Sequence, residues 1–114
     1  MEKTAIDDEA YRAVKDAMGE IFNELIQTFQ AYVPQQISQL GEAIAQADSA
    51  AVFNAAHAIK SASGTIGALG LASTAEHIEQ LGRADKVDDI GQHYRVLQEQ
   101  YQQAIDFLLQ DNTT

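Results

Sequence analysis

Apolar residues recur every three or four positions over most of this chain, and no other sequence feature restricts the fold as strongly. Such spacing gathers the apolar residues on one side of an α-helix. No stretch of useful length alternates apolar and polar residues as a half-buried strand would. The pattern therefore predicts an all-α fold. The longest apolar stripe consists of Phe22, Leu25, Ile26, Phe29, Val33, Ile37, Leu40 and Ile44.

The periodic stretches predict helices over residues 6–18, 22–47, 49–66, 71–83 and 86–110. Because the connections between the last four are short, we expect an antiparallel up-down-up-down four-helix bundle. The short additional N-terminal helix would lie across one end. At 114 residues, the chain is expected to form a single domain, residues 1–114, without a linker or repeat.

A few residues mark expected interruptions. Pro34 cannot donate a backbone hydrogen bond, so it predicts a kink in the second helix. Gly67 and Gly70 predict the turn after the third helix, because glycine adopts left-handed backbone angles readily. Residues 111–114 are expected to form a frayed tail.

Composition excludes several classes of protein. The net charge of −10 disfavours nucleic acid and anionic membrane surfaces as partners. The absence of cysteine excludes disulfides and thiol catalysis. No apolar run is long enough to span a membrane, and the first residues lack the apolar core of a secretory signal. We expect a cytoplasmic protein.

The stretch from Ala55 to Gly67 concentrates the residues suited to chemistry. On a helix, Lys60 and Gly64 lie one and two turns beyond His57, within roughly 60° of it around the axis. An imidazole near neutral pH has a free nitrogen that can act as a nucleophile, and a nearby lysine favours an incoming anion. Gly64 in a helix costs about 1 kcal/mol relative to alanine, which suggests that a partner approaches the backbone there.

The run His57-Ala-Ile-Lys60-Ser61-Ala-Ser-Gly64-Thr-Ile-Gly67 resembles the signature of histidine phosphotransfer (HPt) domains. The glycine that commonly follows the lysine in that family is Ser61 here, which is a small residue and a mild departure. The resemblance implies that His57 is the phosphoacceptor and that Lys60 balances the charge of the phosphoryl group.

The stretch from Glu76 to Arg83 resembles a second helical region of the family. In that region a polar residue about 22 positions after the histidine steadies the imidazole, and this offset falls on Glu79. From the residues alone, Glu79 could equally form an ion pair with Arg83 one turn along the helix. The two interpretations are compatible.

Other family features fall on candidate partner-binding residues. Gly64 would clear space for the active-site loop of the partner, although it could instead be a glycine at a close helix crossing. Ser61 and Arg83 match positions near the site. Tyr32 is either a core residue or part of the apolar edge on which partners dock.

The implied function is a phosphorelay carrier between receiver domains, fed by a hybrid sensor histidine kinase. The phosphoaspartate and its Mg²⁺ would belong to the receiver, and the chain would need no cofactor of its own. It has no Gly-x-x-x-x-Gly-Lys-[Ser/Thr] loop for ATP, so it is not an autonomous kinase. We expect a monomer. The alternative is a helical adaptor that binds receiver domains or other proteins without being phosphorylated.

The other two histidines, His77 and His93, raise the question of a metal site. Neither lies three to five residues from another histidine, and there is no cysteine to complete a zinc site. Both are expected on the surface, and no metal site is expected.

Overall fold

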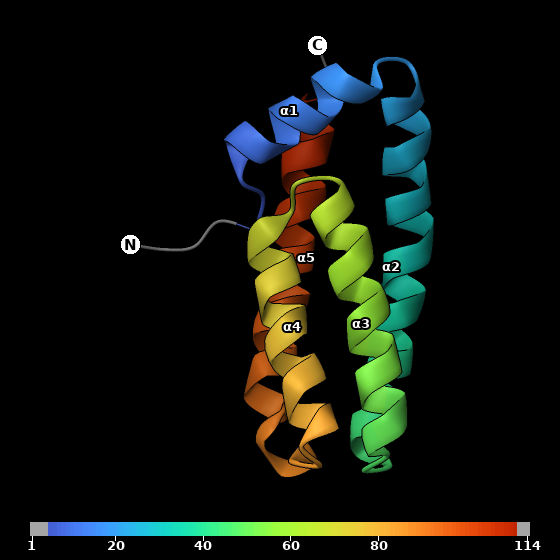
Figure 1. The fold of residues 1–114 in the computed structure, drawn as a ribbon, viewed down its shortest axis with the longest axis vertical. Helices are drawn as coiled ribbons and strands as arrows, with labels where there is room; N and C mark the ends of the chain where they lie inside the picture. The colour runs from blue at the N-terminus through green and yellow to red at the C-terminus, as the bar shows by residue number, and fades with distance from the viewer. Residues whose placement is uncertain (1–4, 112–114) are drawn as a thin grey trace.

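The computed structural model describes residues 5–111, which form helices joined by short turns and contain no strand (Figure 1). The prediction of an all-α fold is confirmed. A short 3-10 helix, η1 (Val87–Asp89), precedes the last α-helix. The α-helices are α1 (Asp8–Met18), α2 (Ile21–Ala45), α3 (Ser49–Thr65), α4 (Leu69–Arg83) and α5 (Gly91–Asp111).

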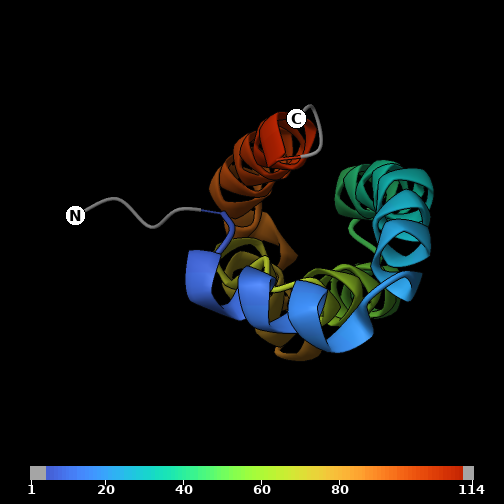
Figure 2. The same cartoon turned by 90° about the horizontal axis from the view of Figure 1, so that it is seen from above.

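The four longer helices lie alongside one another, and the chain direction alternates from each to the next (Figure 1). α3 packs against both α2 and α4, and α5 packs mainly against α4. α1 crosses one end of this assembly, as the view from above shows (Figure 2). Within residues 5–111, no helix is both long enough and apolar enough to cross a membrane.

The core lies between the helices and follows the apolar periodicity of the sequence. Buried apolar side chains in a helical domain supply most of its favourable folding free energy. The α2 stripe contributes Phe22, Ile26, Phe29, Val33, Ile37 and Leu40, each at most 8% exposed. The facing side chains come from α3, α4 and α5 and include Val52, Ile59, Leu71, Ile78, Leu97 and Leu108.

α1 is fastened to the end of α5 by a buried tyrosine. The Tyr11 hydroxyl donates to Asp111 Oδ2 at 2.6 Å, and Lys15 Nζ lies 2.7 Å from the same oxygen. Burial and the Asp111 carboxylate raise the pKa of the Tyr11 phenol. The expectation of a frayed tail is therefore wrong at Asp111, because this contact and the helix extend through it. Residues 112–114 lie outside the described residues.

Several expected boundaries need correction. α4 begins at Leu69, so Gly70 lies inside its first turn, where its N–H donates to the Ala5 carbonyl. The fifth helix begins at Gly91 instead of residue 86, because η1 forms a separate turn before it. Pro34 needs no such correction, because α2 is helical on both sides of it, and a kink there stays a prediction.

Gly67 forms the expected turn and also allows α1 to pack closely against it. Its φ of +82° is in the left-handed region, which residues with a side chain rarely adopt. A Cβ at this position would lie 2.5 Å from the Tyr11 backbone nitrogen. The Gly67 carbonyl also accepts a hydrogen bond from the Asp7 N–H at 3.0 Å. The backbone of α1 therefore approaches the α3–α4 turn at a distance that only glycine permits.

Candidate functional site

The residues singled out by sequence lie on the facing surfaces of α3 and α4. α3 begins at an N-cap, where the Asp48 carboxylate accepts from the Ala51 N–H at 3.1 Å. α4 approaches it closely because Gly82 has no side chain. A Cβ on Gly82 would lie 3.0 Å from a Val52 methyl carbon and 3.1 Å from the Phe53 nitrogen. This close approach brings side chains of α4 within reach of His57.

A buried carboxylate connects the histidine and the lysine. Glu79 of α4 is 4% exposed, and its Oε2 lies 2.5 Å from His57 Nδ1. Its other oxygen, Oε1, accepts from Lys60 Nζ at 2.7 Å. The His57 side chain remains 58% exposed, and that of Lys60 32%. His57 thus lies at the edge of the core, and Glu79 holds the Nδ1 edge of its ring.

The ionisation of Glu79 decides which nitrogen of a neutral His57 ring carries the proton. Burial raises the pKa of the Glu79 carboxyl, but the hydrogen bonds from Lys60 and His57 outweigh it, and the pKa lies below its ordinary value. Glu79 is therefore ionised near neutral pH and can only accept hydrogen bonds. The proton of a neutral His57 consequently belongs on Nδ1, which leaves the lone pair of Nε2 free on the far edge of the ring.

Arg83 has a different neighbour from the one considered for it in the sequence. The ion pairs of Glu79 within residues 5–111 are those with His57 and Lys60, whereas the Arg83 guanidinium lies over the Phe53 ring, 5.1 Å from its centroid. Phe53 in turn stacks with His57, with ring centroids 6.0 Å apart and planes inclined by 12°. Phe53 was not among the site residues predicted from the sequence. Its position four residues before His57 was the available signal.

Two small residues leave the surface beside His57 open. Ser61 and Gly64 are both exposed on α3. No atom outside the glycine's own helical surroundings lies within 4 Å of where a Gly64 Cβ would be. A close helix crossing, the alternative considered for this glycine, is therefore wrong.

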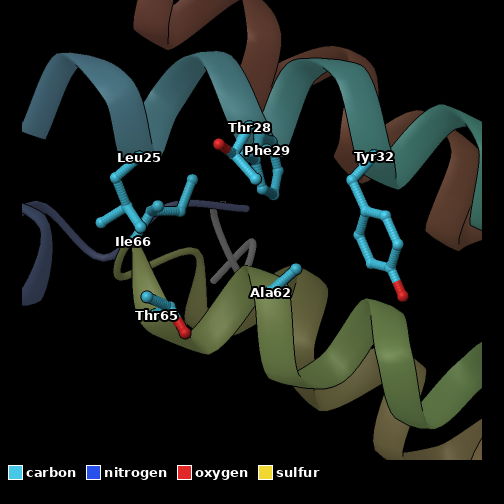
Figure 3. A pocket seen from close by; sticks show the side chains of 7 residues that line it. All are labelled: Leu25, Thr28, Phe29, Tyr32, Ala62, Thr65 and Ile66. Carbon is cyan, nitrogen blue, oxygen red and sulfur yellow. The ribbon is translucent and has the colours of Figure 1, made fainter.

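Tyr32 belongs to a neighbouring apolar pocket between α2 and α3 (Figure 3). The pocket has a volume of about 200 Å³. Tyr32 extends from α2 toward α3 with 40% of its surface exposed, so it is not a core residue (Figure 3). The lining residues are Leu25, Thr28, Phe29, Tyr32, Ala62, Thr65 and Ile66.

The two remaining histidines lie together, which their sequence separation does not indicate. The rings of His77 on α4 and His93 on α5 stack with centroids 5.3 Å apart. Among residues 5–111, no group of three or more histidine, cysteine, aspartate or glutamate side chains could hold a metal ion.

Replacing Glu79 with glutamine should lower the free energy of unfolding by about 1–2 kcal/mol near pH 7, because a charged acceptor of two hydrogen bonds becomes neutral. The folded-state pKa of Glu79 is lowered. Its ion pairs therefore stabilise the fold above the ordinary pKa of a glutamate, and this contribution is lost as the pH falls through the folded-state value. The difference between the wild type and Glu79→Gln should shrink between about pH 5 and pH 3. Urea denaturation across this range measures it, and a difference that stays constant would contradict the assignment.

Comparison with known proteins identifies the family. Residues 24–107 match the Hpt domain family, and the chain belongs to it, as the motif around His57 predicted. The fold is similar to that of histidine-containing phosphotransfer protein B from Pseudomonas aeruginosa PAO1. The TM-score is 0.75 at 21% sequence identity, and the match covers 95% of this chain and 92% of that chain. A comparison with curated proteins finds no match. Hpt domains act in histidine phosphotransfer in two-component systems, with receiver domains and kinases as partners.

Proposed function

We propose that this chain is a phosphorelay carrier that accepts a phosphoryl group on Nε2 of His57 from a receiver phosphoaspartate and passes it to the aspartate of another receiver. The scaffold would be an antiparallel up-down-up-down four-helix bundle with α1 across one end. The observation that carries the proposal is the contact of His57 Nδ1 with the buried Glu79 carboxylate at 2.5 Å, on an imidazole that is 58% exposed. This combination fixes one nitrogen and leaves the other accessible.

The transfer step follows from the neutral His57 ring carrying its proton on Nδ1. The Nε2 lone pair attacks the phosphorus in line with the bond to the receiver aspartate. A P–N bond forms as that P–O bond breaks, and its electron pair stays on the receiver carboxylate. The proton remains on Nδ1, so the phosphorylated ring is cationic and is stabilised by ionised Glu79. In the onward step a second carboxylate attacks the phosphorus, and the P–N electron pair returns to Nε2.

Lys60 would supply positive charge to the phosphoryl group during transfer. It lies one turn from His57 on α3, and its ammonium carries three donors, of which one already meets Glu79 Oε1 at 2.7 Å. The remaining donors are available to phosphoryl oxygens. The chain needs no cofactor of its own in this scheme, because the receiver holds the Mg²⁺ and most of the catalysis is alignment and charge stabilisation.

We assign the docking of the receiver to the open side of α3 and its groove with α2. Ser61 and Gly64 present little bulk there, and Tyr32 lines the apolar pocket alongside. Arg83, over Phe53, borders the other side of His57. The net charge of −10 makes nucleic acid and anionic membranes poor partners. We propose a cytoplasmic monomer that meets receiver domains and a hybrid sensor kinase.

Gly64→Ala separates docking from folding. Alanine should leave the free energy of unfolding unchanged or raise it by up to about 1 kcal/mol, because the position is open and alanine favours helix. Transfer from a phosphorylated receiver should slow roughly tenfold, because the methyl group displaces the partner from its reactive position. Phosphorylation by phosphoramidate, a small donor that needs no docking, should keep the wild-type rate. If Gly64→Ala accepts the phosphoryl group from the receiver as fast as the wild type does, Gly64 is not part of the docking interface.

The same surface could serve an adaptor that binds receivers without being phosphorylated. Incubation with a receiver phosphorylated with radiolabelled phosphate distinguishes the two functions. A carrier acquires label in an acid-labile, base-stable linkage, and the receiver loses an equal amount. An adaptor forms a complex with the receiver and acquires no label.

A further inference from the structure

The His57 ring is restrained from two directions by different kinds of contact. Glu79 holds its Nδ1 edge, and Phe53 lies against its face at a centroid distance of 6.0 Å with the planes 12° apart. The two rings belong to successive turns of α3, so this stacking is set by the helix itself. Near-parallel aromatic pairs at this separation are attractive beyond the area that they bury.

The two contacts restrict different motions. The hydrogen bond to Nδ1 holds one edge of the ring but tolerates small changes in the His57 side-chain torsions, and such changes tilt the imidazole and redirect Nε2. A flat ring against the face of the imidazole opposes that tilt. Transfer in line with the P–O bond of the donor requires the Nε2 lone pair to hold one direction, so the orientation of the ring affects the rate.

Phe53 is itself held from α4. The Arg83 guanidinium lies 5.1 Å from the centre of its ring, in the range of a cation–π contact. The preceding residue, Gly82, allows the α4 backbone to come close to the Phe53 nitrogen. α4 therefore supports the His57 ring twice, directly through Glu79 and indirectly through Arg83 and Phe53.

We propose that Phe53 is a positioning residue for phosphoryl transfer, which holds the His57 imidazole in the orientation where Glu79 binds Nδ1 and Nε2 is exposed. The inference rests on the proposed function of His57. The flat aromatic face of Phe53 holds the plane of the imidazole, which an aliphatic side chain of similar size cannot do. Arg83 then also has a role in the unbound protein, as the support of that face.

The test compares Phe53→Leu, which removes the flat ring, with Phe53→Tyr, which keeps it. Phosphorylation by phosphoramidate reports on the imidazole alone, because the Nε2–P bond forms as ammonia leaves and no receiver is required. Phe53→Leu should slow this reaction roughly two- to twelve-fold, and Phe53→Tyr should restore it. Phe107→Leu is the matched control, because Phe107 is a half-buried phenylalanine in α5 that packs on Tyr11. It should not change the rate.

A spectroscopic measurement keeps the test independent of folding. In the wild type, nuclear Overhauser effects between the ring protons of Phe53 and His57 are expected, and the His57 ring signals should show a single tautomer with the proton on Nδ1. Absence of these effects overturns the inference whether or not Phe53→Leu folds. If Phe53→Leu is folded and reacts at the wild-type rate, the positioning role of Phe53 is overturned. The proposed function then still stands, because the wild type accepts the phosphoryl group. A wild type that accepts none from phosphoramidate or from a receiver overturns the proposed function and this inference together.

Discussion

Replacing His57 with glutamine is expected to abolish phosphoryl transfer and leave the fold intact. Glutamine has no nucleophilic nitrogen, so no P–N bond can form. The His57 side chain is 58% exposed, and the change should alter the free energy of unfolding by no more than about 1 kcal/mol. Incubation with a phosphorylated receiver, followed by measurement of acid-labile label on the chain, tests the first expectation. Circular dichroism during thermal unfolding tests the second.

The other two histidines provide the control for this variant. His77 and His93 stack on each other between α4 and α5, apart from the cluster around Glu79. A chain in which both are replaced by glutamine should acquire label at the wild-type rate. Undiminished labelling of His57→Gln would show that another residue is the phosphoacceptor and would refute the assignment.

Replacing Gly67 with alanine should cause the largest loss of stability, roughly 3–5 kcal/mol in the free energy of unfolding. The φ of +82° penalises any side chain, and the new Cβ would meet the Tyr11 nitrogen at 2.5 Å and its Cα at 2.7 Å. Because both of these atoms belong to the backbone, α1 must move away as a unit. That movement would withdraw the buried Tyr11 ring from Phe22 and Phe107.

Chemical denaturation measures this loss, and hydrogen exchange locates it. Amides of α1 should lose protection first, since that helix is displaced. Gly91→Ala is the matched control, because a Cβ at Gly91 would have no atom within 4 Å. It should be neutral or slightly stabilising. A Gly67→Ala variant as stable as the wild type would show that α1 does not depend on this close approach.

The helices were predictable because apolar periodicity is a local property of the sequence. The stripe from Phe22 to Ile44 indicates both the helix and its buried side. The errors occur where tertiary contacts decide. Asp111 was expected in a frayed tail, but Tyr11 and Lys15, about a hundred positions earlier, fix it in place.

The candidate site was predictable where the spacing of the motif corresponds to turns of one helix. His57, Lys60 and Gly64 share a stripe of α3 for this reason. Sequence could not choose between the two partners considered for Glu79, since that depends on the packing of α3 against α4. The approach permitted by Gly82 brings Glu79 to His57, and it leaves Arg83 over Phe53. An interhelical contact of this kind has no periodic signal along the chain.

The most direct test is to find the atom that carries the phosphoryl group. Chain labelled with ¹⁵N is phosphorylated by a receiver, and long-range ¹H–¹⁵N and ³¹P spectra then assign the modified ring nitrogen. We expect one phosphoryl group per chain, on Nε2 of His57, with Nδ1 still protonated. A phosphoryl group on Nδ1, on His77 or His93, or on no histidine at all would contradict it.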